Sequence, residues 1–265
     1  LLPILQNMDG GLEEASRTAG GSPVQTFRRV TLPLLWPATL GIIILQSILL
    51  LGSLEIPLLF GPAETFAWWR AWVLIGVVFA ATVESMAALA RESPALLEER
   101  FRSPLQRGQP RADQVWVMIF MAACVSVIAF IPEDVFRLHV FAVPGPSVST
   151  AGLGLFVAGL VLATLALRAN AFAAPVVKHM KERRQTVVDT GVYSVVRHPM
   201  YAGTLLLLLG MPLWLESYAA TLLAGIPIAL LAVRILIEER FLRRELAGYD
   251  AYTERVRFRV IPGVW

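Results

Sequence analysis

Histidines, cations and tyrosines gather in one polar stretch of the sequence, which runs from Lys178 to Tyr201. It holds two of the three histidines and ends in Arg-His-Pro-Met-Tyr-Ala-Gly over 197–203, where a long apolar run begins. The residue before a proline is pushed out of the helical region, and proline suits the first helical turn. We therefore expect His198 to be extended and Pro199 to open a helix. Such a helix start can hold a carboxylate or a phosphate, although a helix cap with basic residues at a membrane surface is the alternative interpretation.

A second group of charged residues lies near the end of the last apolar run. Arg234 and Glu238 are four residues apart and therefore share one helix face, and Glu239 follows directly. Charges at the end of a membrane helix are costly unless they face a polar cavity, which makes them candidates for a site. Snorkelling to the interface is the alternative. Two tyrosines and three arginines over 249–259 then form a basic, aromatic tail that could cap the site or lie on lipid headgroups.

The composition indicates an integral membrane protein. Hydrophobic residues make up 56% of the 265 residues and charged residues 16%, with a mean hydropathy of +0.64. The net charge is +3, but the basic residues lie between hydrophobic segments, where they act as topology signals, so we predict no nucleic-acid partner. The single cysteine, Cys124, lies in an apolar run, which excludes a disulfide within the chain. We predict no metal site. The first residue is Leu rather than Met, which is typical of a fragment.

Apolar segments predict an all-α, polytopic membrane protein with about six transmembrane helices: 34–60, 68–90, 115–132, 150–168, 201–215 and 218–236. When these segments cross the membrane in turn, the polar stretches on one side hold 20 of the 23 Lys and Arg residues: 12–33, 91–114, 169–200 and 234–259. Positive residues favour the cytoplasmic side. We therefore expect a multi-pass protein whose polar site and C-terminus face the cytoplasm.

The first 62 residues differ in character from the rest. The residues at 14–16, Gly20 and 30–33 have the spacing of the cytoplasmic EAA loop of binding-protein-dependent ABC transporter permeases, which they resemble. The resemblance implies docking on an ATPase subunit, a partner that we expect only if this segment is functional. Because one apolar segment follows before the pattern changes, we predict a permease-like piece with one transmembrane helix over 1–62 and a different module over 63–265. An amphipathic segment with chance spacing is the alternative.

The motifs of the second part occur in a fixed order. Gly191, Tyr193, the 197–203 run, Arg234 with its two acids and the tail over 249–262 together resemble the isoprenylcysteine carboxyl methyltransferase family and its relatives among the phospholipid methyltransferases. The resemblance covers 63–265. It implies a membrane-embedded enzyme that holds S-adenosyl-L-methionine in a cytoplasmic pocket between the polar stretch and the helix ends.

The resemblance also implies roles for individual residues. The implied cofactor-binding residues are Lys178, Gln185, Thr186, Val187, Val188, Tyr193, His198, Pro199, Met200, Tyr201 and Glu238. Arg234 matches a residue on the acceptor side, where a guanidinium would orient a carboxylate or phosphate. His198 is the candidate base if the acceptor is an amine, because imidazole changes protonation near neutral pH. Arg234 and His198 are therefore the candidate catalytic residues.

The expected function is S-adenosylmethionine-dependent methyl transfer to a lipid-soluble or amphipathic acceptor at the cytoplasmic membrane face. The acceptor is either a prenylcysteine-like carboxylate or a phospholipid-like amine. Two alternatives stay open. Membrane reductases that use NADPH share a similar Arg-His-Pro-x-Tyr ending, and the first 62 residues are also consistent with an ABC transporter permease fragment.

Overall fold

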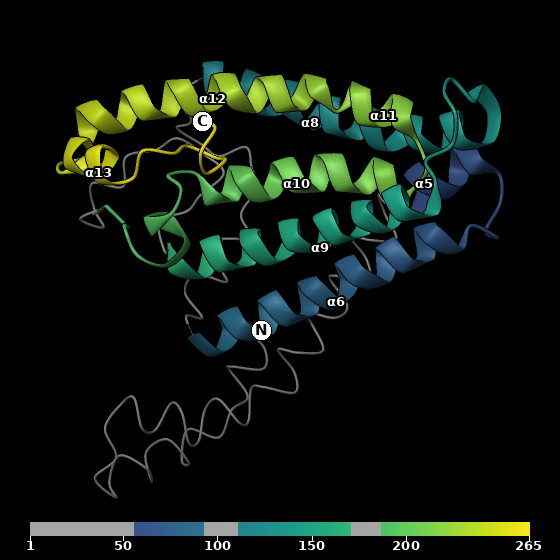
Figure 1. Cartoon of the computed structure of the whole chain (residues 1–265), viewed down its shortest axis with the longest axis horizontal. Helices are drawn as coiled ribbons and strands as arrows, with labels where there is room; N and C mark the ends of the chain where they lie inside the picture. The colour runs from purple at the N-terminus through teal and green to yellow at the C-terminus, as the bar shows by residue number, and fades with distance from the viewer. Residues whose placement is uncertain (1–55, 93–110, 171–186) are drawn as a thin grey trace, which may run out of the picture. The chain divides into compact units, whose positions relative to one another are not determined.

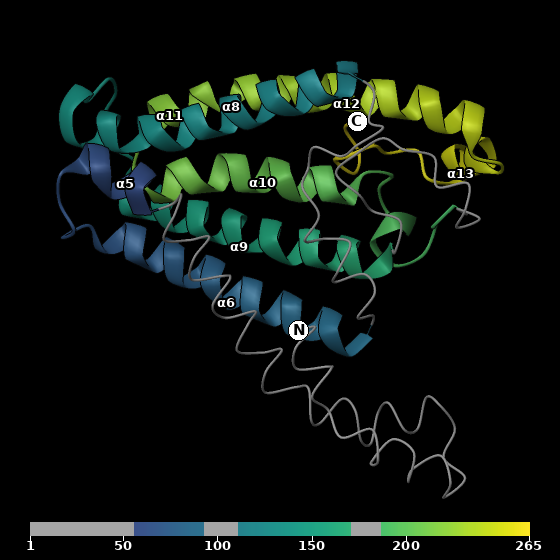
Figure 2. The same cartoon turned by 180° about the vertical axis from the view of Figure 1, so that it is seen from behind.

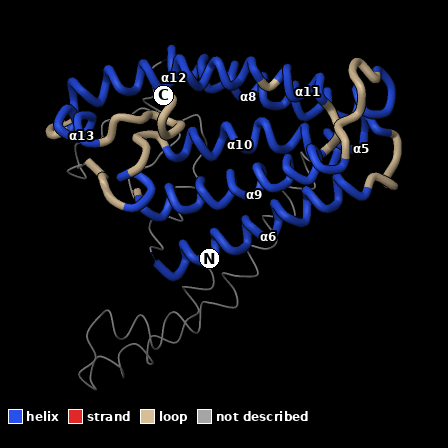
Figure 3. Tube along the Cα trace, viewed as in Figure 1, coloured by secondary structure: helices blue, strands red, loops and turns tan. Residues whose placement is uncertain are grey.

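The computed structural model describes residues 56–92, 111–170 and 187–265, all of which belong to one compact unit, Gly52–Trp265. Figure 3 shows helices and loops over these residues and no strand among them. The predicted all-α class is therefore confirmed. The elements are α5 (Ile56–Ala63), α6 (Trp69–Glu92), α8 (Arg111–Glu133), a π-helical turn η3 (Asp134–Leu138), α9 (Pro146–Ala169), a 3₁₀ turn η5 (Gly191–Ser194), α10 (Pro199–Trp214), α11 (Tyr218–Leu223), α12 (Gly225–Glu245) and α13 (Tyr249–Arg255).

Three stretches of the described residues are long and apolar enough to cross a membrane: Gln114–Leu138, Pro146–Ala169 and Tyr218–Arg244. They overlap the predicted segments 115–132, 150–168 and 218–236. The segment predicted over 201–215 forms a shorter apolar helix, Pro199–Trp214, and the one over 68–90 forms α6. The segment over 34–60 lies outside the described residues up to 55. Six spans are therefore not confirmed, and the number stays a prediction.

The helices form a bundle in which α9 and α10 lie side by side in antiparallel directions (Figure 1 and Figure 2). Helix α6 packs on α9, whereas α8 and α12 lie on the side of α10 (Figure 1). The beginning of α10 and the end of α12 therefore lie at one end of the bundle together with α13, and α5 and α11 lie at the other (Figure 1).

Glycines allow the close contact between α9 and α10. A Cβ atom on Gly159 would lie 2.7 Å from the carbonyl oxygen of Gly203, and one on Gly210 would lie 2.5 Å from the backbone nitrogen of Phe156. Gly152 is equally restricted, because its Cβ would lie 2.7 Å from the backbone nitrogen of Trp214. Apolar surroundings provide little drive for helix association inside a membrane, so small residues that let backbones approach are a main source of contact. The close contact at these glycines fixes the position of α10 and of the residues at its start.

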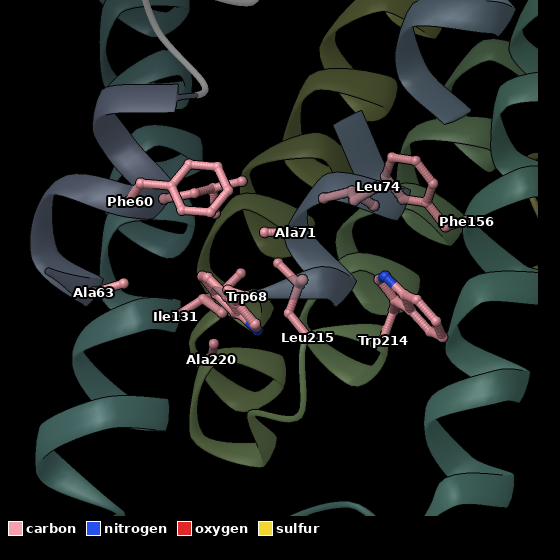
Figure 4. Packing of buried hydrophobic residues seen from close by; sticks show 11 residues of the cluster. Phe60, Ala63, Trp68, Ala71, Leu74, Ile131, Phe156, Trp214, Leu215 and Ala220 are labelled. Carbon is pink, nitrogen blue, oxygen red and sulfur yellow. The ribbon is translucent and has the colours of Figure 1, made fainter. Parts of the chain in front are cut away.

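The largest hydrophobic cluster lies at the α5 end of the bundle. Figure 4 shows the side chains of Phe60, Trp68, Phe156 and Trp214 in this cluster. Its buried members are Leu59, Phe60, Ala63, Trp68, Ala71, Leu74, Ile131, Phe156, Trp214, Leu215 and Ala220. Residues before and after position 62 thus share one core. The predicted boundary between 62 and 63 falls inside α5, and the division into two domains stays a prediction.

Buried polar groups at this end are satisfied by specific partners. The Asp134 carboxylate accepts hydrogen bonds from the Ser217 hydroxyl at 2.6 Å and from the backbone N–H of Val140 at 2.9 Å. Arg70 donates to the carbonyl oxygen of Trp214 at 3.1 Å, and the Trp214 indole donates to the carbonyl oxygen of Arg70 at 2.9 Å. These contacts join α6, η3 and the residues at the end of α10, so polar groups tie this end of the bundle together.

We expect Gly210→Ala to lower the thermal unfolding midpoint of the detergent-solubilised protein, because the added methyl group must push α9 and α10 apart. Overpacking of this kind costs about 1–3 kcal/mol. Gly154→Ala on α9 is the matched control, since a Cβ there meets no atom within 4 Å, and it should keep or raise the midpoint. Equal midpoints for the two variants would show that the α9–α10 contact is loose.

Candidate functional site

The start of α10 is joined to the C-terminal tail by backbone hydrogen bonds. His198 precedes the helix with φ −125° and ψ 62°, outside the helical region, and Pro199 occupies the first turn, as the His-Pro sequence predicts. The N–H of Arg197 donates to the carbonyl oxygen of Phe258 at 2.9 Å, and the N–H of His198 donates to that of Arg259 at 2.8 Å. The tail therefore runs alongside the residues that open the helix.

A buried carboxylate, Glu239, connects α12 to both of these segments. Its exposed fraction is 4%. Its Oε1 accepts a hydrogen bond from Nε of Arg197 at 2.7 Å and lies 3.4 Å from Nε2 of His198. Its Oε2 accepts from Nε of Arg259 at 2.9 Å. A buried carboxylate is stable only when cations and donors compensate it, and this one has both.

The Arg197 side chain completes the connection to the tail. Its guanidinium also donates to the carbonyl oxygens of Val256 and Arg257, at 2.8 Å and 2.9 Å. All of these partners are groups of the protein itself. Arg197 and Glu239 therefore hold the site together and serve as its framework.

Tyr201, in the first turn of α10, contacts both Arg234 and Glu238, which were predicted to share a face of α12. Its hydroxyl donates to Oε2 of Glu238 at 2.6 Å, and the guanidinium of Arg234 is close enough to the same hydroxyl to interact with it. Arg234 is 5% exposed, whereas Glu238 is partly exposed. The ring of His198 stacks on that of Tyr201, with 5.6 Å between centroids. A cation, an anion, a phenol and an imidazole thus meet where α10 begins and α12 ends.

Residues 187–194 of the polar stretch are held by contacts with α13. The Tyr252 hydroxyl donates to the carbonyl oxygen of Tyr193 at 2.7 Å, and Arg255 pairs with Asp189 at 2.7 Å. Burial raises the pKa of the hydroxyls of Tyr252 and Tyr249, so both remain protonated at neutral pH. The protonated Tyr252 is the form that can donate this hydrogen bond, so the contact is maintained over the physiological range.

Of the predicted site residues, His198, Tyr201, Arg234 and Glu238 are brought together by the structure. Pro199 and Met200 lie in the same first turn of α10. Tyr193, Val187 and Val188 belong to the segment near α13, where Val187 packs against the cluster of Tyr249, Tyr252 and Val256. Lys178, Gln185 and Thr186 lie outside the described residues. Within the described ranges, no group of three His, Cys, Asp or Glu side chains is arranged to hold a metal ion.

Some residues of the site carry roles that the sequence did not reveal: Arg197, Glu239, Tyr252, Arg259 and Trp116. The signal that could have separated the two neighbouring acids is helical geometry. Successive residues in an α-helix point about 100° apart, so Glu238 and Glu239 cannot face the same neighbours. One of them had to leave the face that carries Arg234.

Apolar helices with a buried charge cluster at one end of the bundle define a membrane protein with a polar site at its helix ends. Residues 148–247 match the phospholipid methyltransferase family, and residues 2–140 match the family of binding-protein-dependent transport system inner membrane components. The chain therefore belongs to the transport component family, which it matches over its first half, and it is similar to the phospholipid methyltransferase family over the part that holds most of the site. Both predicted resemblances are confirmed.

Individual relatives are similar to parts of this chain. Protein-S-isoprenylcysteine O-methyltransferase B of Arabidopsis thaliana is 29% identical over 143 residues, which cover 51% of this chain and 70% of that protein. The cobalt-zinc-cadmium resistance protein CzcN of Cupriavidus metallidurans is 34% identical over 74 residues, 28% of this chain and 34% of that protein. A probable sulfate transport system permease protein cysT of Chlorella vulgaris is 55% identical over 38 residues, and the chain spans only 14% of its length.

We expect the two neighbouring acids to differ in their effect on stability. Glu239→Gln leaves the buried Arg197 and the partly buried Arg259 without their anion, and breaking a buried ion pair costs about 3–5 kcal/mol. Glu238→Gln removes the charge of a partly exposed group with one hydrogen bond from Tyr201, so it should cost about 1 kcal/mol. Thermal unfolding of both variants in the same detergent measures the difference. Similar midpoints would contradict the framework role of Glu239.

Proposed function

We propose that this chain is an S-adenosylmethionine-dependent methyltransferase that acts on a lipid-soluble or amphipathic acceptor at the cytoplasmic face of the membrane. The observation that carries the proposal is the contact of Tyr201 with both Glu238 and Arg234 at the start of α10. These three residues lie inside the segment that matches the phospholipid methyltransferase family. The methyltransferase activity is inferred from that match, and the cofactor, the acceptor and the side of the membrane are part of the proposal.

The described residues fit the amino-acid end of the cofactor. Glu238 is partly exposed and accepts one hydrogen bond from Tyr201, which leaves a carboxylate with further acceptor capacity for an ammonium or sulfonium group. The first turn of α10 presents backbone N–H groups that have no intrahelical acceptor, and these favour a carboxylate. When bound, the cofactor would supply a methyl group that its sulfonium already makes electrophilic.

Arg234 is suited to the acceptor. It lies one helical turn from Glu238 towards the apolar middle of α12, where it is buried and permanently charged. A guanidinium in apolar surroundings forms strong charge-assisted hydrogen bonds to a carboxylate or a phosphate. It would hold the anionic end of a lipid-soluble molecule beside the cofactor, so that the two reacting atoms meet at the membrane boundary.

His198 bears on the choice of acceptor. Its Nε2 lies 3.4 Å from the buried Glu239, which is itself neutralised by Arg197. That contact engages one ring nitrogen and leaves the other as the candidate base if the acceptor is an amine. A carboxylate acceptor needs no base. We favour a prenylcysteine-like carboxylate over a phospholipid-like amine because of the name of the Arabidopsis relative.

The match of residues 2–140 to transport components supports a separate role for the N-terminal part. The loop over 12–33, which lies outside the described residues, would dock on an ATPase subunit. This second candidate rests on the loop over 12–33, whereas Tyr201, Glu238 and Arg234 all lie after α9.

We expect S-adenosylhomocysteine, and not NADPH, to raise the thermal unfolding midpoint of the detergent-solubilised chain, because only a ligand that binds the folded state stabilises it. Glu238→Gln should weaken the binding of S-adenosylhomocysteine by about 1–3 kcal/mol through loss of a charge-assisted contact. Glu254→Gln, at an exposed acid on α13, is the control and should leave the affinity unchanged. Protection by NADPH alone would favour a membrane reductase.

We expect Arg234→Lys to depress methyl transfer to N-acetyl-S-farnesylcysteine, because an ammonium cannot offer the planar fork of a guanidinium to a carboxylate. The affinity for S-adenosylhomocysteine should stay within about twofold, a difference of roughly 0.4 kcal/mol. Calorimetry and the transfer assay on one preparation separate the two quantities. Loss of cofactor affinity in step with activity would place Arg234 on the cofactor side.

A further inference from the structure

Helix α8 lies outside the segment that matches the phospholipid methyltransferases, yet it packs against helices that carry the site. Its sequence falls within the residues matched by the transport component family, 2–140. One hydrophobic cluster joins Val127 of α8 to Leu208 of α10 and Leu231 of α12, with Trp116, Phe120 and Tyr201 packed against it. The wall of the site near Tyr201 is therefore built partly from α8.

The clearest contact between α8 and the charged residues is made by Trp116. The guanidinium carbon of Arg234 lies over the indole ring, 4.6 Å from its centroid. Trp is the aromatic side chain that attracts a cation most strongly, and the attraction grows when the pair is removed from water, as it is for the buried Arg234. Phe120, one turn further along α8, stacks on Trp116 with 5.1 Å between centroids and an angle of 8°.

The Trp116 ring contacts its neighbours through its faces. Its Nε1 is buried and has no hydrogen-bond partner among the residues that the structure describes. The indole N–H therefore does not determine where the ring lies; its stacking on Phe120 and its contact with the Arg234 guanidinium do. A guanidinium over an aromatic face directs its N–H groups outward in its own plane. Those in-plane donors are the ones that can serve Tyr201 and an anion of the acceptor.

We propose that Trp116 is a positioning residue, whose indole face holds the guanidinium of Arg234 in the orientation that receives the anionic end of the acceptor. The proposal rests on the proposed function, since it assigns Arg234 to the acceptor. It extends that function by making α8, a helix outside the methyltransferase match, part of the acceptor side of the site. Trp116 itself does not touch the reacting atoms.

The test compares three variants of the full chain in the same detergent. Trp116→Leu removes the aromatic face, Trp116→Phe keeps a face but lacks the N–H, and Phe130→Leu removes a partly buried aromatic ring of α8 that packs in the cluster at the α5 end. For each variant, kcat and KM are measured with two acceptors in separate assays, N-acetyl-S-farnesylcysteine and phosphatidylethanolamine vesicles. The dissociation constant of S-adenosylhomocysteine is measured on the same samples.

We expect Trp116→Leu to lower kcat/KM about tenfold, equivalent to about 1.4 kcal/mol, with a higher KM and an unchanged affinity for S-adenosylhomocysteine. Trp116→Phe should restore kcat/KM to within about threefold of the wild type, because the ring face is what holds the cation. Phe130→Leu should stay within about twofold. If Trp116→Leu and Phe130→Leu have equal effects, or Phe does not rescue, Trp116 is only a packing residue and the proposal is wrong.

A second measurement does not depend on the acceptor. In a double-mutant cycle of Trp116→Leu and Arg234→Gln, the unfolding midpoints should deviate from additivity by about 2–4 °C, because each change removes the same contact. Additive shifts would overturn the contact. If the wild type neither binds S-adenosylhomocysteine nor methylates either acceptor, the proposed function fails, and so does the acceptor role of Trp116. The cycle then reports separately whether Trp116 holds Arg234.

Discussion

The structure depends most on the neutralisation of one buried carboxylate. Glu239 lies near the end of an apolar helix, where an uncompensated charge would be strongly destabilising. Two arginines far apart in the sequence, Arg197 and Arg259, provide the compensation. To reach it, the chain must bring the start of α10 and the C-terminal tail to the same point on α12. The order of these three segments around the site therefore follows from the requirement to satisfy one side chain.

This framework lies beside a second group of charged residues. Because Glu238 and Glu239 are consecutive on a helix, they point to different surroundings. Glu239 is hydrogen-bonded to Arg197 and Arg259. Glu238 is partly exposed and accepts a hydrogen bond from the Tyr201 hydroxyl, which also interacts with Arg234. Glu239 with its two arginines thus supports the neighbouring group around the partly exposed Glu238. The close glycine contacts of α9 and α10 add to the rigidity, since they fix the backbone from which Tyr201 projects.

The features that could be predicted from the sequence are those with a local pattern. A proline after His198 indicated where α10 begins, and a spacing of four indicated that Arg234 and Glu238 share a face. The apolar runs indicated the helices. By contrast, the burial of Glu239 depends on Arg259, and the environment of Arg234 depends on Trp116, more than a hundred residues away. No local rule connects such positions, and the number of spans likewise could not be settled by hydropathy alone.

The packing of α5 and α8 determines where this chain can be divided. Leu59 and Phe60 of α5 and Ile131 of α8 are buried together with Phe156 and Trp214, which belong to the methyltransferase match. The two family matches meet between 140 and 148, but the core does not separate there. A chimera joined at that point would lack α5 and α8, whose apolar side chains pack against those of α9 and α10. A segment of this chain that is to keep the core of α9 and α10 therefore has to include α5 and α8.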